Sequence, residues 1–124
     1  MIAIIDYGVG NLRSVQKAFE AIGQQAEVTS DKAVIEAASH VVLPGVGAFG
    51  AAAATLRSHG LEDVARDAAV SGRPFLGICV GMQMLFDVSF EYGEHAGLGL
   101  LPGSVVSFDT TNPQAKVPQI GWNA

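Results

Sequence analysis

Short apolar runs alternate with amphipathic helical patterns from Met1 to Val88, and few architectures accommodate such an order. The apolar run 1–5 reads as a strand buried on both faces, and further strands are predicted at 26–29, 40–43 and 74–78. Helical patterns follow them at 12–22, at 32–38 after a cap at Ser30 or Asp31, at 61–69 and at 80–88. Repeated strand–helix–strand units give parallel strands with helices on both faces. The order therefore predicts an α/β three-layer sandwich, a mainly parallel doubly wound sheet of flavodoxin-like type.

The pattern changes after Glu91, where glycines and prolines mark turns around short strand-like pieces such as Val105–Phe108. An exposed loop is predicted at Thr110–Gln114 and another strand at Val117–Trp122. No repeat, low-complexity tract or linker divides the chain. Residues 1–124 are therefore predicted to form a single domain.

Composition and charge indicate what kind of protein this is and which partners it can bind. Nearly half of the residues are apolar and 15% are charged, which is enough to fill a core. The net charge is −5, and no Lys/Arg cluster is available to displace counterions, so no nucleic-acid partner is predicted. The single cysteine fits a reducing compartment. The uncharged stretch 41–56 contains Pro44 and Gly45, and reads as a strand, a Gly loop and a helix start rather than a membrane span. With no basic leader before Asp6, we expect a cytoplasmic protein.

The segment from Gly77 to Gly81 reads Gly-x-Cys-x-Gly between a predicted strand and a predicted helix. This is the thiol counterpart of the nucleophile elbow, in which a sharp turn projects the central residue above the sheet. A helix N-terminus would favour the thiolate of Cys79. The N–H of Val80 would supply half of an oxyanion hole. The alternative is that Cys79 is a small buried hydrophobe.

A Gly-rich loop follows the third predicted strand and has three possible roles. Gly45, Gly47 and Gly50 spell Gly-x-Gly-x-x-Gly, the dinucleotide fingerprint. The loop follows the wrong strand for that role, and the acidic residues about twenty positions on lie in a helical pattern. A second role is the other half of the oxyanion hole, in which an N–H of Val46 or Gly47 turns toward a carbonyl held at Cys79. The third is a tight turn that needs glycine for its dihedral angles. No cofactor and no metal site is predicted.

Together these segments resemble class I glutamine amidotransferases, and more narrowly the glutaminase subunits of imidazole glycerol phosphate synthases. The resemblance covers the whole chain. The broader match is carried by Gly77-Ile-Cys-Val-Gly-Met-Gln83 and Pro44-Gly-Val-Gly47. The narrower match is carried by Ile5-Asp-Tyr-Gly-Val-Gly-Asn-Leu-Arg-Ser-Val-Gln-Lys-Ala18, Leu43-Pro-Gly-Val-Gly-Ala-Phe49 and Val117-Pro-Gln-Ile-Gly-Trp-Asn123.

The resemblance implies a chemistry. Cys79 would attack the side-chain amide of glutamine, giving a glutamyl thioester and ammonia. Gly47, Gln83 and Glu91 match positions that hold the substrate glutamine. From the residues alone, Gln83 and Glu91 would be solvated helix or loop residues.

The resemblance also implies a partner, a cyclase of (βα)₈-barrel fold that uses the ammonia to make imidazole glycerol phosphate in histidine biosynthesis. Asn11 and Trp122 are candidates for residues near the cyclase surface. The alternative for Trp122 is a plain core aromatic.

Two departures from the family pattern stand out. Gln119 stands where the family usually has His, which affects local hydrogen bonding. The family's catalytic base and its orienting carboxylate come from a His-x-Glu segment well beyond the Trp-Asn pair. No histidine of this chain is followed by an acidic residue two positions later; they are His40, His59 and His95. We therefore expect an N-terminal part of an amidotransferase that turns glutamine over poorly alone.

Two other interpretations remain open. The chain could be a non-catalytic scaffold or docking module of the same fold. It could also be another class I member, such as a pyrimidine or aminobenzoate pathway amidotransferase, although the segment 6–18 argues against that.

Overall fold

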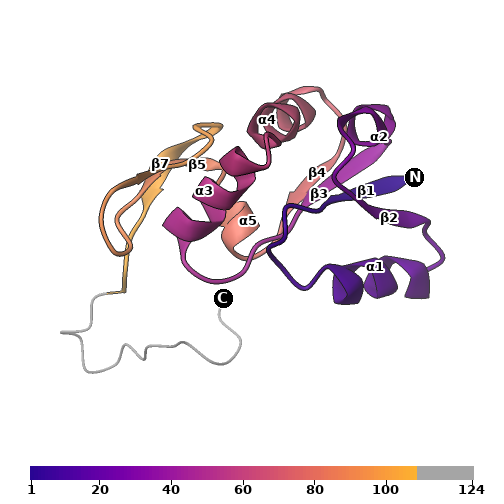
Figure 1. The fold of residues 1–124 in the computed structure, drawn as a ribbon, viewed down its shortest axis with the longest axis horizontal. Helices are drawn as coiled ribbons and strands as arrows, with labels where there is room; N and C mark the ends of the chain where they lie inside the picture. Colours follow the sequence, from indigo (N-terminus) through magenta and orange to yellow (C-terminus); the bar gives the residue numbers. More distant parts are fainter. Residues whose placement is uncertain (109–124) are drawn as a thin grey trace.

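The computed structural model describes residues 1–108, and its centre is a four-stranded parallel sheet (Figure 1). The strands lie in the order β2-β1-β3-β4, and they span β1 (Ile2–Ile5), β2 (Ala26–Thr29), β3 (His40–Leu43) and β4 (Phe75–Gly77). The predicted parallel sheet is confirmed. β4 is shorter than the predicted 74–78 because only three residues pair with β3.

Alternate side chains of β1 enter two separate cores. Ala3 and Ile5 belong to the larger core, whereas Ile2 and Ile4 belong to a smaller one on the opposite face. All four are buried. Because strand side chains alternate between the two faces, a strand covered on both sides must be apolar throughout. Burial on both faces is thus the physical reason for the unbroken apolar run at the start of the chain.

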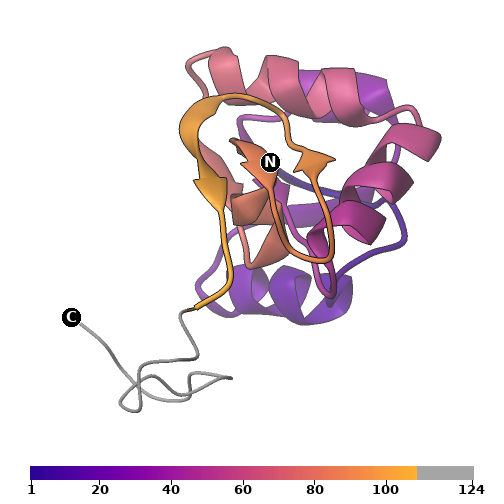
Figure 2. The same cartoon turned by 90° about the vertical axis from the view of Figure 1, so that its left-hand side faces the viewer.

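Helices cover the two faces unequally. α1 (Leu12–Ala21) lies on one face and packs Leu12, Val15 and Phe19 against the smaller core. The other face is covered by α2 (Lys32–Ala37), α3 (Phe49–Ser58) and α4 (Glu62–Val70) (Figures 1 and 2). The predicted three-layer arrangement is therefore confirmed. No helix within residues 1–108 is both long and apolar enough to cross a membrane.

The six-residue helix α2 is held by a side chain at each end. The Asp31 carboxylate accepts a hydrogen bond from the Ala33 N–H at 2.9 Å, so Asp31 rather than Ser30 is the N-cap. At the other end the Arg73 guanidinium lies within 3.2 Å of three backbone carbonyl oxygens, those of Ile35, Glu36 and Ala38. A helix this short is marginal alone, and these contacts satisfy the polar groups that its ends leave open.

The helix after Cys79 is much shorter than predicted. α5 covers only Val80–Gln83, and the chain continues into the strand β5 (Phe86–Ser89), so the predicted helix at 80–88 is wrong beyond its first turn. Phe86 and Val88 are aromatic and β-branched residues that favour strands. Their pairing with a later segment overrides the helical pattern.

That later segment completes a second sheet, in the order β6-β5-β7. β6 (His95–Ala96) runs antiparallel to β5, and β7 (Leu101–Val105) runs parallel to it. The predicted strand-like piece 105–108 overlaps β7 only at Val105. The predicted loop 110–114 and the predicted strand 117–122 lie outside the described residues.

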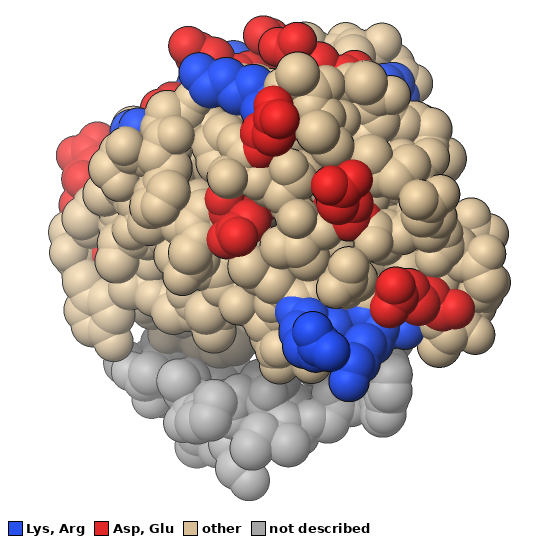
Figure 3. Space-filling view, turned by 45° about the vertical axis from the view of Figure 1, so that its right-hand side comes forward, with Lys and Arg blue, Asp and Glu red and all other residues tan. Residues whose placement is uncertain are grey.

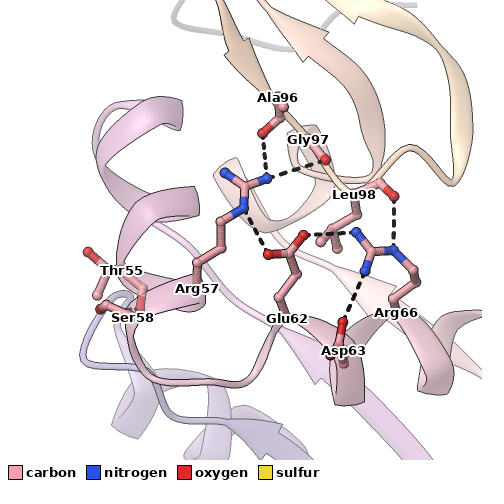
Figure 4. A network of polar contacts seen from close by, with 9 residues as sticks. All are labelled: Thr55, Arg57, Ser58, Glu62, Asp63, Arg66, Ala96, Gly97 and Leu98. Carbon is pink, nitrogen blue, oxygen red and sulfur yellow. Dashed lines mark hydrogen bonds and ion pairs between the residues drawn. The ribbon is translucent and has the colours of Figure 1, made fainter.

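An arginine network joins the second sheet to α3 and α4 (Figure 4). Glu62 binds the Arg57 Nε and the Arg66 Nη2, each at 2.8 Å. Arg57 also donates to the Ala96 carbonyl at 2.9 Å, and Arg66 donates to the Leu98 carbonyl at 3.3 Å. Burial alone would raise the pKa of Glu62, but hydrogen bonds and charge from Arg66 and Arg57 outweigh it and lower the pKa. The carboxylate is therefore the centre of the network.

We expect Glu62→Gln to lower the free energy of unfolding by about 1 kcal/mol at neutral pH. The lowered pKa means that this stabilisation is present above the ordinary carboxyl pKa and is lost as the pH falls through the folded value. The difference between variant and native chain should therefore shrink below about pH 4. Urea titrations at several pH values would measure it.

Asp63→Asn is the matched control, because the Asp63 side chain is 91% exposed and binds the same Arg66 at 3.3 Å. It should change stability very little. Equal losses from the two variants would contradict the central role of Glu62.

Candidate active site

Cys79 lies in the turn between β4 and α5 with a backbone conformation that L-residues rarely adopt. Its φ is 54° and its ψ is −121°. The predicted strand-to-helix elbow with sparsely populated dihedral angles is therefore confirmed. The side chain is exposed, so the alternative of a small buried hydrophobe is wrong. Strained non-glycine residues of this kind concentrate at functional sites.

The two glycines of the elbow are required by close backbone approaches. A Cβ on Gly77 would lie 2.6 Å from the Cα of Met82. A Cβ on Gly81 would lie only 2.0 Å from the carbonyl oxygen of Leu43, at the end of β3. The glycine spacing therefore lets α5 double back tightly on β4 and lie against the neighbouring strand.

The Gly-rich loop after β3 contacts the elbow. Gly45 is buried, and a Cβ there would lie 2.6 Å from the backbone nitrogen of Gly81. Val46 is 62% exposed, and Gly47 has a φ of 85° with open space around the position of a Cβ. Within residues 1–108 the backbone N–H groups of Val46, Gly47 and Val80 donate no hydrogen bond. All three predicted oxyanion donors are thus without an acceptor in the described part of the chain.

The third glycine of the dinucleotide pattern has a different role. Gly50 lies inside α3, and a Cβ there would lie 2.6 Å from the ring of His95. At the start of the same helix the Phe49 N–H donates to the Glu91 carboxylate at 3.1 Å. An anion of the protein itself therefore occupies the helix N-terminus where a pyrophosphate would bind. This arrangement argues against dinucleotide binding.

Gln83 and Glu91 line one cavity of about 270 Å³. Its other walls come from the end of β7 and the residues after it, Val105, Val106, Ser107 and Phe108. The structure thus brings together two residues predicted to hold glutamine, and neither is fully solvated. Cys79 is not among the described residues that line this cavity. Among residues 1–108 no group of three or more His, Cys, Asp or Glu side chains is placed to hold a metal ion.

A known protein family contains the sequence of this chain almost from end to end. Residues 3–124 match the family described as glutamine amidotransferase class-I. This chain belongs to that family.

Relatives of the amidotransferase chain give a narrower comparison. It is 56% identical over 124 residues to the imidazole glycerol phosphate synthase subunit HisH of Rhodopirellula baltica, and 52% identical over 128 residues to the subunit of that name from Salinibacter ruber. Each match covers 100% of this chain, and the chain spans about 60% of the length of each relative. A crystal structure of a glutamine amidotransferase superposes with a TM-score of 0.69 at 24% identity, covering 86% of this chain and 56% of that one. The superposition supports the α/β fold.

Two hydroxyl groups near the elbow and the cavity were not predicted from the sequence. The fully buried Ser89 accepts a hydrogen bond from the Glu91 N–H at 3.1 Å, which orients the carboxylate-bearing residue. The fully buried Tyr7 donates its hydroxyl to the Pro44 carbonyl at 2.6 Å. The Ser89 contact joins residues two positions apart, and a serine often makes such a bond in a turn. No local pattern identifies the Tyr7 contact, which spans 37 positions.

Each histidine of the amidotransferase chain contacts a group other than the cysteine. His40 lies 2.8 Å from the Ser39 hydroxyl and opens β3, whose other end carries the loop. Within residues 1–108 no histidine hydrogen-bonds Cys79; His59 and His95 are bound instead to the Thr55 carbonyl at 2.9 Å and the Tyr92 carbonyl at 3.1 Å.

The surface residues predicted to contact a partner are only partly described. Asn11 is exposed at the N-cap position of α1 and makes no side-chain cap bond. Trp122 and Gln119 lie outside the described residues. On the face shown in Figure 3 the acidic side chains are scattered and the basic ones form small groups.

Proposed function

We propose that this chain carries the nucleophile of a glutaminase, with Cys79 as that nucleophile. Its thiolate sulfur bonds to the side-chain amide carbon of glutamine, and the carbonyl oxygen becomes an oxyanion. The C–N bond then breaks, ammonia leaves with an added proton, and water hydrolyses the glutamyl thioester to glutamate. The observation that carries this proposal is the strained, exposed Cys79 beside backbone N–H groups that have no acceptor within residues 1–108.

The N–H groups of Val46, Gly47 and Val80 are the proposed oxyanion donors. A developing negative charge gains most from donors that are already oriented and not bonded elsewhere. Val80 opens α5, whose four residues give a weaker dipole than the helix predicted from the sequence. Direct hydrogen bonds from these amides therefore contribute more than the helix dipole does.

Gly47, Gln83 and Glu91 are the proposed substrate contacts. The shared cavity supports the pairing of Gln83 with Glu91. A carboxylate and an amide suit the charged amino group and the carboxylate of a free amino acid. Glu91 also bonds the start of α3, which ties the cavity to the helix that follows the Gly-rich loop.

The proposed destination of the ammonia is a cyclase of (βα)₈-barrel fold in a cytoplasmic heterodimer that makes imidazole glycerol phosphate for histidine biosynthesis. The identities of 56% and 52% with HisH subunits support this. Asn11 and Trp122 are the proposed interface residues, and the exposure of Asn11 agrees with that role. Co-purification with a cyclase, compared between the native chain and Asn11→Ala, tests the pairing.

A second candidate is a docking module of the same fold without turnover. The observation in its favour is that no histidine within residues 1–108 reaches Cys79 through a hydrogen bond. Loss of a positioned acid or base typically slows a reaction by about 10²–10⁴-fold. The two candidates therefore differ in turnover more than in substrate binding.

We expect the 124-residue chain to be labelled at Cys79 by a chloroketone analogue of glutamine, with free glutamine protecting it. Ammonia release from glutamine should be slower than that of the full-length R. baltica subunit by about 10²–10⁴-fold. Mass spectrometry and an ammonia assay, with and without the cyclase, measure the two quantities.

Equal rates of ammonia release would show that a base lies within these 124 residues. Labelling that glutamine does not slow would contradict the proposed substrate. Iodoacetamide labelling of the urea-unfolded chain is the control for thiol content.

A further inference from the structure

Tyr7 has a hydroxyl group that packing alone does not require. The residue follows β1 and is fully buried, and its ring belongs to the larger core. A phenylalanine would fill the same space. The hydroxyl donates to the Pro44 carbonyl at 2.6 Å, across 37 positions of sequence. The hydroxyl is therefore used for one contact, and that contact is with the first residue of the Gly-rich loop.

This hydrogen bond lies in a continuous series of contacts that reaches the elbow. A Cβ on Gly45 would lie 3.1 Å from the Tyr7 hydroxyl and 2.6 Å from the Gly81 nitrogen. Gly45 therefore lies close to both the phenol and the turn that carries Cys79. Because the peptide unit is planar, fixing the Pro44 carbonyl also fixes the direction of the Gly45 N–H.

The loop is anchored on both sides of its exposed part. Upstream, Tyr7 holds Pro44, and downstream Glu91 accepts from the Phe49 N–H at 3.1 Å. Between these anchors Val46 and Gly47 donate no backbone hydrogen bond within residues 1–108. The orientation of the two candidate oxyanion donors therefore depends on the anchors.

We propose that Tyr7 is a positioning residue for the oxyanion loop, holding the Pro44 carbonyl inward so that the amides of Val46 and Gly47 face a carbonyl bound at Cys79. This inference rests on the function proposed above. Burial raises the pKa of Tyr7 to about 12, so the phenol stays protonated and donates throughout the physiological range. The contact is therefore constant and not pH-dependent.

The test compares two electrophiles on the same thiol in the native chain and in Tyr7→Phe. Iodoacetamide alkylates Cys79 by displacement at a saturated carbon and forms no oxyanion. The chloroketone analogue of glutamine presents a carbonyl that the loop amides would bind. Direct removal of an oxyanion donor lowers rates by about 10²–10³-fold. For a residue that acts through the loop, we expect the chloroketone rate to fall about tenfold, with the iodoacetamide rate unchanged within about twofold.

Thr29→Val is the matched control, since it removes another shielded hydroxyl, one that accepts from the Asp31 N–H at 3.0 Å on the far strand β2. It should lower the melting temperature without changing the ratio of the two labelling rates. An unchanged ratio in Tyr7→Phe would overturn the positioning role. If glutamine fails to protect the native chain from the chloroketone, the proposed function itself fails, and the two failures are thereby distinguished.

Discussion

A Cys79→Gly variant is expected to be more stable than the native chain and to lack the proposed glutaminase chemistry. The residue has a φ of 54° and a ψ of −121°, a conformation that strains a side chain but not a glycine. Such strain is worth about 1–3 kcal/mol. Glycine also makes the unfolded chain more flexible, which opposes the gain by about 0.5–1 kcal/mol. We expect a net gain of about 1 kcal/mol in the free energy of unfolding.

Cys79→Ala separates the two effects. Alanine removes the thiol but keeps the Cβ and hence the strain, so it should abolish labelling without raising stability. Removal of a catalytic nucleophile lowers turnover by up to about 10⁶-fold. Urea titrations and chloroketone labelling of both variants measure the outcome. If Cys79→Gly proves no more stable than Cys79→Ala, the elbow stores no strain.

Gly81→Ala is expected to destabilise the fold by about 3 kcal/mol or more. The added Cβ would lie 2.0 Å from the Leu43 carbonyl oxygen, 2.8 Å from the Leu43 carbonyl carbon and 3.0 Å from the Pro44 carbonyl carbon. All three are backbone atoms, so no flexible side chain can move aside. The loop and the elbow must separate, and chloroketone labelling of Cys79 should slow as well.

Gly72→Ala provides the comparison for that prediction. Gly72 has a φ of 87° but nothing within 4 Å of the position of its Cβ. Its replacement therefore measures the effect of a left-handed backbone without a clash, about 1–2 kcal/mol. Thermal and urea unfolding would compare the two. A loss in Gly81→Ala no larger than that in Gly72→Ala would mean that the close approach is easily relaxed.

The first sheet could be predicted because its information is local. β1 is apolar throughout because it is buried on both faces, and the short runs of β2 and β3 were predicted with the bounds that the structure gives. The helix at 80–88 was mispredicted because a short apolar run fits either a helix or a strand. What decides between them is the pairing of Phe86 with Leu101 and of Val88 with Ser104, which local periodicity does not contain.

In the candidate site, too, local features could be predicted from the sequence and long-range contacts could not. The glycines two positions either side of Cys79 predict the elbow, since their spacing reflects a turn within five residues. The hydrogen bonds from Tyr7 to Pro44 and from Phe49 to Glu91 depend on where separate segments pack. The first spans 37 positions, and no residue pattern between its ends signals it.

The arginine network also bears on local opening of the molecule. Arg57 and Arg66 tie the carbonyls of Ala96 and Leu98 to the helical layer, and the Leu98 N–H donates to the Met84 carbonyl at 2.7 Å, directly after α5. Detachment of the second sheet would therefore release the C-terminal end of the one-turn helix that carries the elbow. Contiguous segments of this kind open as cooperative units with their own free energy. The exchange rate of the α5 amides with solvent deuterium would then follow the strength of the salt bridges that Glu62 makes with Arg57 and Arg66.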